Sequence, residues 1–147
     1  MKIEIVTGNL KLDIYGFRGI AVKKDYAGTA FRLSGKMWEV IRLNNIKNKG
    51  KNIWVYDVAE KVFAGVELEN DITINNNYGL EKYTIDIKKY AYLKYTGAYN
   101  KIKQTGEYMT KELTRQGFEI TLPYIEIYGH WTSDETKLET ELLMCLQ

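Results

Sequence analysis

Residues 123–129 read PYIEIYG and residues 52–57 read NIWVYD, and these two stretches decide the fold class. Apolar side chains alternate in both with aromatic or acidic ones, which is the period of a β-strand with two different faces. Ile125 and Ile127 share one face of the first stretch. We expect that face to lie under helices and to form the core, because it is wholly apolar.

The opposite face of these two predicted strands is rich in aromatic rings. It carries Tyr124, Glu126 and Tyr128 in one stretch and Trp54 and Tyr56 in the other. Aligning the stretches puts Trp54 opposite Glu126 and Tyr56 opposite Tyr128. A carboxylate flanked by rings suits an organic cation, because ring faces attract positive charge and partial burial strengthens an ion pair.

The same alternation predicts further strands along the chain. They are expected at 2–6, 12–22, 52–58, 62–68, 83–95, 124–128 and 139–146. A first, short helix is predicted to open at Ser34 as its N-cap and to end near Asn45. A second is predicted from near Gly97 to a left-handed cap at Gly117, with apolar residues at helical spacing.

This order of elements predicts an internal duplication of a strand–helix–strand–strand unit. Similar short stretches support the duplication: residues 24–27 read KDYA before the first helix, and residues 88–91 read KKYA before the second. We therefore predict one α+β domain over residues 1–147, built from two βαββ repeats at about 1–75 and 76–147.

Composition narrows the class of protein. The chain has 21 basic and 19 acidic residues in no blocks, so direct nucleic-acid binding is not expected. No apolar run is long enough for a membrane span, and no signal peptide is visible, so we expect a cytoplasmic protein. With one histidine and one cysteine, no metal cage of those ligands is expected. No cofactor is expected either.

Three stretches carry a family resemblance: residues 89–99 read KYAYLKYTGAY, residues 123–128 read PYIEIY and residues 63–67 read FAGVE. With them the sequence resembles the gyrase-inhibitor-like (GyrI-like) small-molecule-binding domain of bacteria, which is also the effector-binding module of AraC-type and MerR-type transcription regulators. The strongest match is residues 89–99, which resemble the family's strand running into the second helix, and the other two stretches resemble two of its other strands. Tyr95 stands where many members carry histidine.

The resemblance implies two halves related by a pseudo-twofold axis, a curved antiparallel sheet with two main helices, and a ligand cleft between the halves. It implies that this cleft accepts apolar or cationic, multidrug-like compounds around a central Glu126. It implies wall residues as well, with Trp38 and Tyr99 projecting from the helix starts. The expected ligand-binding set is Trp38, Trp54, Tyr56, Tyr99, Tyr124, Glu126 and Tyr128.

Three functions fit the sequence. The first is a stand-alone module, monomeric or dimeric, that binds an apolar or cationic aromatic ligand and could serve a transcription regulator. The second is a protein-interaction module such as an inhibitor of DNA gyrase. The third is a hydrolase of small electrophilic compounds, with Glu126 as the general base.

Overall fold

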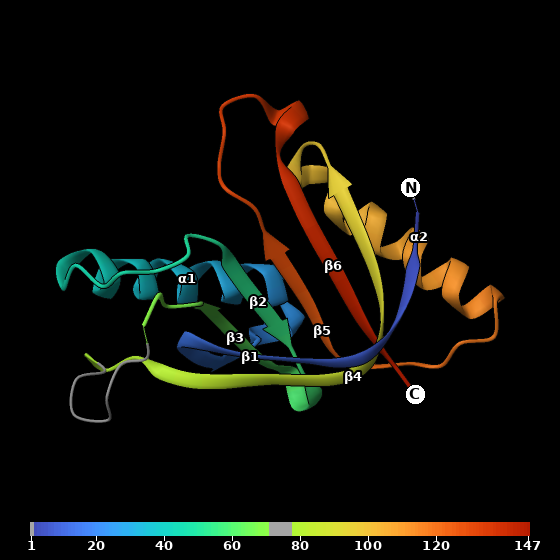
Figure 1. The fold of residues 1–147 in the computed structure, drawn as a ribbon, viewed down its shortest axis with the longest axis horizontal. Coiled ribbons are helices and arrows are strands. Elements are labelled where there is room, and N and C mark those ends of the chain that lie inside the picture. The colour runs from blue at the N-terminus through green and yellow to red at the C-terminus, as the bar shows by residue number, and fades with distance from the viewer. Residues whose placement is uncertain (1, 71–77) are drawn as a thin grey trace.

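The computed structural model describes residues 2–70 and 78–147. Six antiparallel strands close into a barrel in the order β1-β3-β2-β5-β6-β4, and two long helices lie outside it (Figure 1). The strands are β1 (Glu4–Ile20), β2 (Asn52–Tyr56), β3 (Lys61–Val66), β4 (Glu81–Thr96), β5 (Ile120–Tyr128) and β6 (Glu139–Leu146). The helices are α1 (Tyr26–Leu43) and α2 (Ile102–Arg115).

The barrel interior is the main core, and it contains no helix residue. Its buried side chains come from all six strands: Ile14, Ile53, Val55, Phe63, Ile85, Ile87, Ile125, Leu143 and Cys145. The expectation that Ile125 and Ile127 lie under the helices is therefore wrong. Because the sheet closes on itself, its inner faces bury one another, and Ile125 is 0% exposed without any helix above it.

Both helices pack instead on the outer face of the barrel. Met37 and Ile41 of α1 pack with Tyr15, Phe17 and Val66 on β1 and β3. On the other side, α2 packs on β4 and β6, where Met109 and Leu113 meet Ala91, Leu93, Leu142 and Met144. The outer faces of β2 and β5 are thus left between the two helices.

The first helix is longer than predicted. It begins at Tyr26, where Asp25 is the N-cap and its side chain accepts a hydrogen bond from the Gly28 N–H at 3.0 Å. Ser34, the predicted cap, is a buried residue of the helix interior. Serine and aspartate are comparable caps, so residue type alone does not choose between them. Packing of the first two turns against the barrel favours Asp25.

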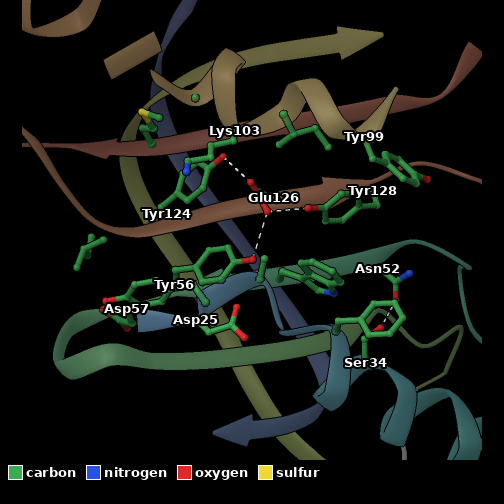
Figure 2. A pocket seen from close by; sticks show the side chains of 18 of the residues that line it. Asp25, Ser34, Asn52, Tyr56, Asp57, Tyr99, Lys103, Tyr124, Glu126 and Tyr128 are labelled. Carbon is green, nitrogen blue, oxygen red and sulfur yellow. Dashed lines mark hydrogen bonds between the residues drawn. The ribbon is translucent and has the colours of Figure 1, made fainter. Parts of the chain in front are cut away.

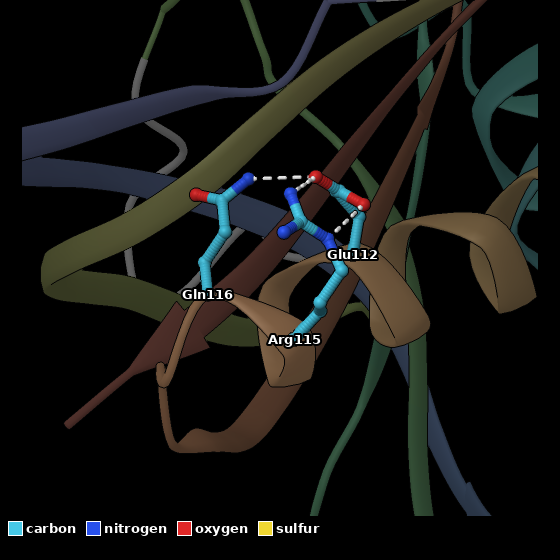
Figure 3. A network of polar contacts seen from close by, with 3 residues as sticks. All are labelled: Glu112, Arg115 and Gln116. Carbon is cyan, nitrogen blue, oxygen red and sulfur yellow. Dashed lines mark hydrogen bonds and ion pairs between the residues drawn. The ribbon is translucent and has the colours of Figure 1, made fainter.

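The second helix agrees better with its prediction. A short 3-10 turn over Tyr99–Lys101 leads into α2, and Gly117 follows it with φ 88°. The N–H of Phe118 donates to the Leu113 carbonyl at 3.0 Å, which closes the helix end. Figure 3 shows the exposed last turn, where Arg115 and Gln116 both donate to Glu112. Arg115 holds the pKa of that carboxyl at about 2.

The order of elements is strand–helix–strand–strand twice, as predicted. One of the sequence similarities that suggested the repeat does not correspond to equivalent positions in the structure. Residues 24–27 lie at the start of α1, whereas residues 88–91 lie within β4. The predicted boundary of the halves, near residue 75, lies outside the described residues. The pseudo-twofold relation between the halves stays a prediction.

The strands expected at 2–6 and 12–22 form one long strand, β1. Its pairing with β4 shifts register between Thr7 and Leu10.

Among the helices of the described residues, none is both long and apolar enough to cross a membrane.

Candidate functional site

A cavity of about 1370 Å³ lies over the uncovered part of the barrel (Figure 2). The outer faces of β2 and β5 form its floor, and α1 and α2 flank it on opposite sides. The cavity therefore draws on both halves of the chain. Its volume exceeds the several hundred cubic ångströms usual for a site that holds one drug-sized molecule.

All seven residues of the predicted binding set line this cavity: Trp38, Trp54, Tyr56, Tyr99, Tyr124, Glu126 and Tyr128. Two positional details were wrong. Trp38 projects from the later half of α1, since that helix begins earlier than predicted. Tyr56 pairs with Tyr124 and not with Tyr128, because β2 and β5 run antiparallel about the Trp54–Glu126 pair.

The carboxylate of Glu126 occupies the middle of the cavity floor and is surrounded by tyrosines. One oxygen, Oε1, accepts hydrogen bonds from the hydroxyls of Tyr128 at 2.7 Å and Tyr56 at 3.4 Å. The other, Oε2, accepts from the Tyr124 hydroxyl at 2.8 Å. Glu126 is only 8% exposed. Its neighbours Tyr124 and Tyr128 reach it because residues two apart share a strand face.

The three hydroxyls stay protonated well beyond the usual range of tyrosine. Burial raises the pKa of Tyr56, Tyr124 and Tyr128, and the negative charge of Glu126 raises it further. Each hydroxyl therefore remains a donor to the carboxylate. No arginine, lysine or histidine in residues 2–70 or 78–147 forms an ion pair with Glu126, so its charge is hydrogen-bonded without being neutralised.

Aromatic rings surround this carboxylate in contact with one another. The Tyr128 ring lies 4.7 Å from Trp54 and 5.6 Å from Tyr99, measured between centroids. Tyr56 stacks on Tyr124 at 5.9 Å. Such edge and offset contacts hold the rings rigidly and leave ring faces for other groups.

One end of the cavity carries a polar cluster. The Asn52 side-chain oxygen accepts hydrogen bonds from the Trp38 indole N–H at 2.6 Å and from the Ser34 hydroxyl at 2.9 Å. Asn52 pairs with Tyr128 across β2 and β5, two residues from the Trp54–Glu126 pair.

Sequence reasoning missed several lining residues. Tyr26 and Phe31 lie on the first two turns of α1, which were predicted to precede the helix. Trp131 follows β5 and is 74% exposed, and no periodic pattern marks it. Asn52 begins β2 on the same face as Trp54, so alternation could have found it.

The described part of the chain contains no group of side chains suited to hold a metal ion. Nowhere in it do three or more histidine, cysteine, aspartate or glutamate side chains lie together in a suitable cluster. Chemically, the cavity offers a buried negative charge, ring faces, a few fixed hydrogen-bonding groups and, among its exposed lining residues, charged side chains such as Arg42, Lys103 and Glu107.

Comparison with known families decides the relationship. The model of the GyrI-like small molecule binding domain matches residues 47–147 of this sequence. The chain belongs to this family. No curated protein matches the sequence.

Solved structures share the fold of this GyrI-like domain. The C-terminal domain of EcmrR superposes with a TM-score of 0.71 at 16% identity, covering 100% of this chain and 99% of that one. SAV2435 bound to tetraphenylphosphonium superposes with a TM-score of 0.64 at 15% identity, covering 100% of this chain and 94% of that one. A hydrolase from Listeria innocua superposes with a TM-score of 0.61 at 9% identity, covering 99% of this chain and 92% of that one. At these identities the likeness concerns the fold.

Proposed function

We propose that this GyrI-like domain binds a bulky aromatic cation in its cavity, with Glu126 as the buried counter-charge. The observation that carries the proposal is the state of the Glu126 carboxylate. It is 8% exposed, it is held by three tyrosine hydroxyls, and it has no cationic partner among the described residues. A buried charge without a partner is costly, and an incoming cation relieves that cost.

The surrounding rings favour one kind of cation. Each of the three hydroxyls already donates a hydrogen bond to Glu126, so a ligand with N–H donors meets a carboxylate with most of its acceptor capacity in use. A cation without such donors, such as a quaternary phosphonium, approaches through the ring faces of Trp54 and Tyr128 and leaves the hydrogen bonds intact. Cation–π contacts of this kind stabilise a desolvated cation by about 1 to 2 kcal/mol each.

A structural neighbour lends support. SAV2435 was solved with tetraphenylphosphonium, which is a permanent cation carrying four phenyl rings. The aromatic lining and the volume of about 1370 Å³ suit a ligand of that size.

Calorimetric titration with tetraphenylphosphonium and with neutral triphenylphosphine oxide tests the proposal. The wild-type protein is expected to bind the cation and to bind the oxide much more weakly. In Glu126→Gln the cation should lose at least about tenfold in affinity. At about 6 Å and an effective dielectric constant of 20, the lost attraction is about 2 to 3 kcal/mol before desolvation is subtracted.

The matched control is Glu107→Gln. Glu107 also lines the cavity, but it is exposed at the edge, where water screens its charge. It should leave the affinity for the cation nearly unchanged. Equal binding of cation and oxide, or an equal loss in the two variants, would show that Glu126 is not the counter-charge.

A hydrolytic function finds less support in the cavity. Both oxygens of Glu126 already accept hydrogen bonds from tyrosines, so little of its acceptor capacity is left for a general base to use. The hydroxyl of Ser34 donates to Asn52. Cys145 lies inside the barrel, where burial raises the pKa of its thiol to about 11, so it is a poor nucleophile.

A further inference from the structure

The side-chain amide of Asn52 is locked in one orientation. Its oxygen accepts a hydrogen bond from the Ser34 hydroxyl at 2.9 Å (Figure 2) and another from the Trp38 indole N–H at 2.6 Å. An indole N–H can only donate, so the atom facing Trp38 must be the amide oxygen and not the nitrogen. The two donors therefore fix which end of the amide is which.

The amide nitrogen of Asn52 consequently faces away from these donors with two N–H groups to give. No described residue accepts a hydrogen bond from this nitrogen, and the nitrogen is not buried, so a ligand can reach it. Asn52 lines the cavity. A fixed, unpaired donor thus stands at the edge of the cavity, beside the aromatic rings of its floor.

A second unpaired donor lies near this end of the cavity. Ser34, Trp38 and Arg42 are spaced four residues apart on α1, so they lie on one face of the helix. Arg42 lines the cavity, is exposed, and forms no ion pair within residues 2–70 and 78–147. The polar end therefore carries an uncompensated positive charge, opposite in sign to Glu126.

We propose that Asn52 and Arg42 form an acceptor subsite that binds a carbonyl or carboxylate oxygen of the ligand. This inference rests on the proposed binding of a cation at Glu126. Asn52 lies two residues along β2 from Trp54, which pairs with Glu126. Two residues of strand span about 7 Å, so the ligand class is an aromatic cation with an oxygen acceptor about 7 Å from its charge.

Three phosphonium ions of nearly the same shape test the subsite. They are benzyltriphenylphosphonium, its 4-methoxycarbonyl ester and its 4-carboxylate. Calorimetry on the wild-type protein should show the ester binding about threefold tighter than the parent and the carboxylate about tenfold tighter, because hydrogen bonds to charged acceptors are the stronger.

Asn52→Asp is the sharpest variant. Its carboxylate keeps acceptors for Ser34 and Trp38 but removes both N–H donors. The added charge acts on the cationic centre of all three probes, so the affinity ratios are the readout. The preference for the ester should vanish, and the carboxylate should bind more weakly than the parent.

Arg42→Gln, which alters an exposed residue, gives an independent reading. It should reduce the advantage of the carboxylate at least about threefold and that of the ester by less, because the ester brings no charge for Arg42 to pair with. Arg32→Gln is the matched control, because Arg32 lies on the same helix outside the cavity lining.

The outcomes separate the two proposals. If the parent cation binds but neither oxygen probe is preferred, or if Asn52→Asp keeps the preference, the acceptor subsite is wrong and the cation site stands. If no probe binds the wild-type protein, both proposals fail.

Discussion

Replacing in turn each tyrosine that holds Glu126 with phenylalanine should lower stability in a graded way. The hydroxyls of Tyr128 and Tyr124 lie 2.7 Å and 2.8 Å from the carboxylate, whereas that of Tyr56 lies 3.4 Å away. Good O–H···O hydrogen bonds fall below about 3.0 Å, and a bond to a charged acceptor contributes about 1.5 to 3 kcal/mol. The cavity admits water, so we expect the lower end of that range.

Urea unfolding should therefore show Tyr124→Phe and Tyr128→Phe each losing about 1.5 to 2 kcal/mol, with an unchanged dependence on denaturant. Tyr56→Phe should lose about 0.5 kcal/mol. In thermal melts the two larger losses correspond to about 3 to 8 °C. In a Glu126→Gln background the same substitutions should cost less, since the acceptor is then neutral. Equal losses at all three positions, or a larger loss at Tyr56, would refute the assignment of the two short bonds.

Three other expectations concern stability and are read by denaturant or thermal unfolding. Gly16→Ala should lower the free energy of unfolding by at least about 3 kcal/mol, because its added methyl would lie 1.8 Å from the Ala64 carbonyl oxygen where β1 meets β3. A variant as stable as the wild type would disprove this close approach. Gly106→Ala should gain about 0.5 to 1 kcal/mol, since the nearest atoms stand 3.8 Å from the new methyl within α2; a loss would mean that the helix is not free to accept it. Burial, and then the charge of Asp57, raises the pKa of Tyr83 from 10.0 to about 12, so the folded protein keeps a proton that the unfolded chain releases. Stability should fall as the pH rises from about 10 to 12, and Tyr83→Phe should flatten that fall; an identical pH profile would contradict it.

Alternation along the chain predicted most of each strand and the floor of the cavity, although it divided β1 into two strands and missed the start of β5. Side chains two apart on a strand must share a face, so Tyr124, Glu126 and Tyr128 had to lie together wherever the strand was placed. That inference needs only local geometry. The pairing of Trp54 with Glu126 came instead from the similarity of two short stretches that are far apart in the sequence.

The rest depended on long-range packing. Whether the sheet closes is decided by the pairing of β1 with β4, the first and last strands of the order β1-β3-β2-β5-β6-β4. No local feature of the sequence indicates that pairing. Closure placed Ile125 inside the barrel and moved the helices to the outer face. The start of α1 depended in the same way on packing, because both Asp25 and Ser34 can cap a helix. Missing that start hid Tyr26 and Phe31.

The tryptophans of this chain have a practical consequence. There are three, Trp38, Trp54 and Trp131, and all of them line the cavity. None lies in the barrel interior, where an indole would emit a constant background. The tryptophan fluorescence of the protein, excited selectively over that of its tyrosines, therefore originates entirely at the cavity. The molecule carries a built-in optical reporter of whatever enters it, and single Trp→Phe variants would map which end a guest occupies without any added dye.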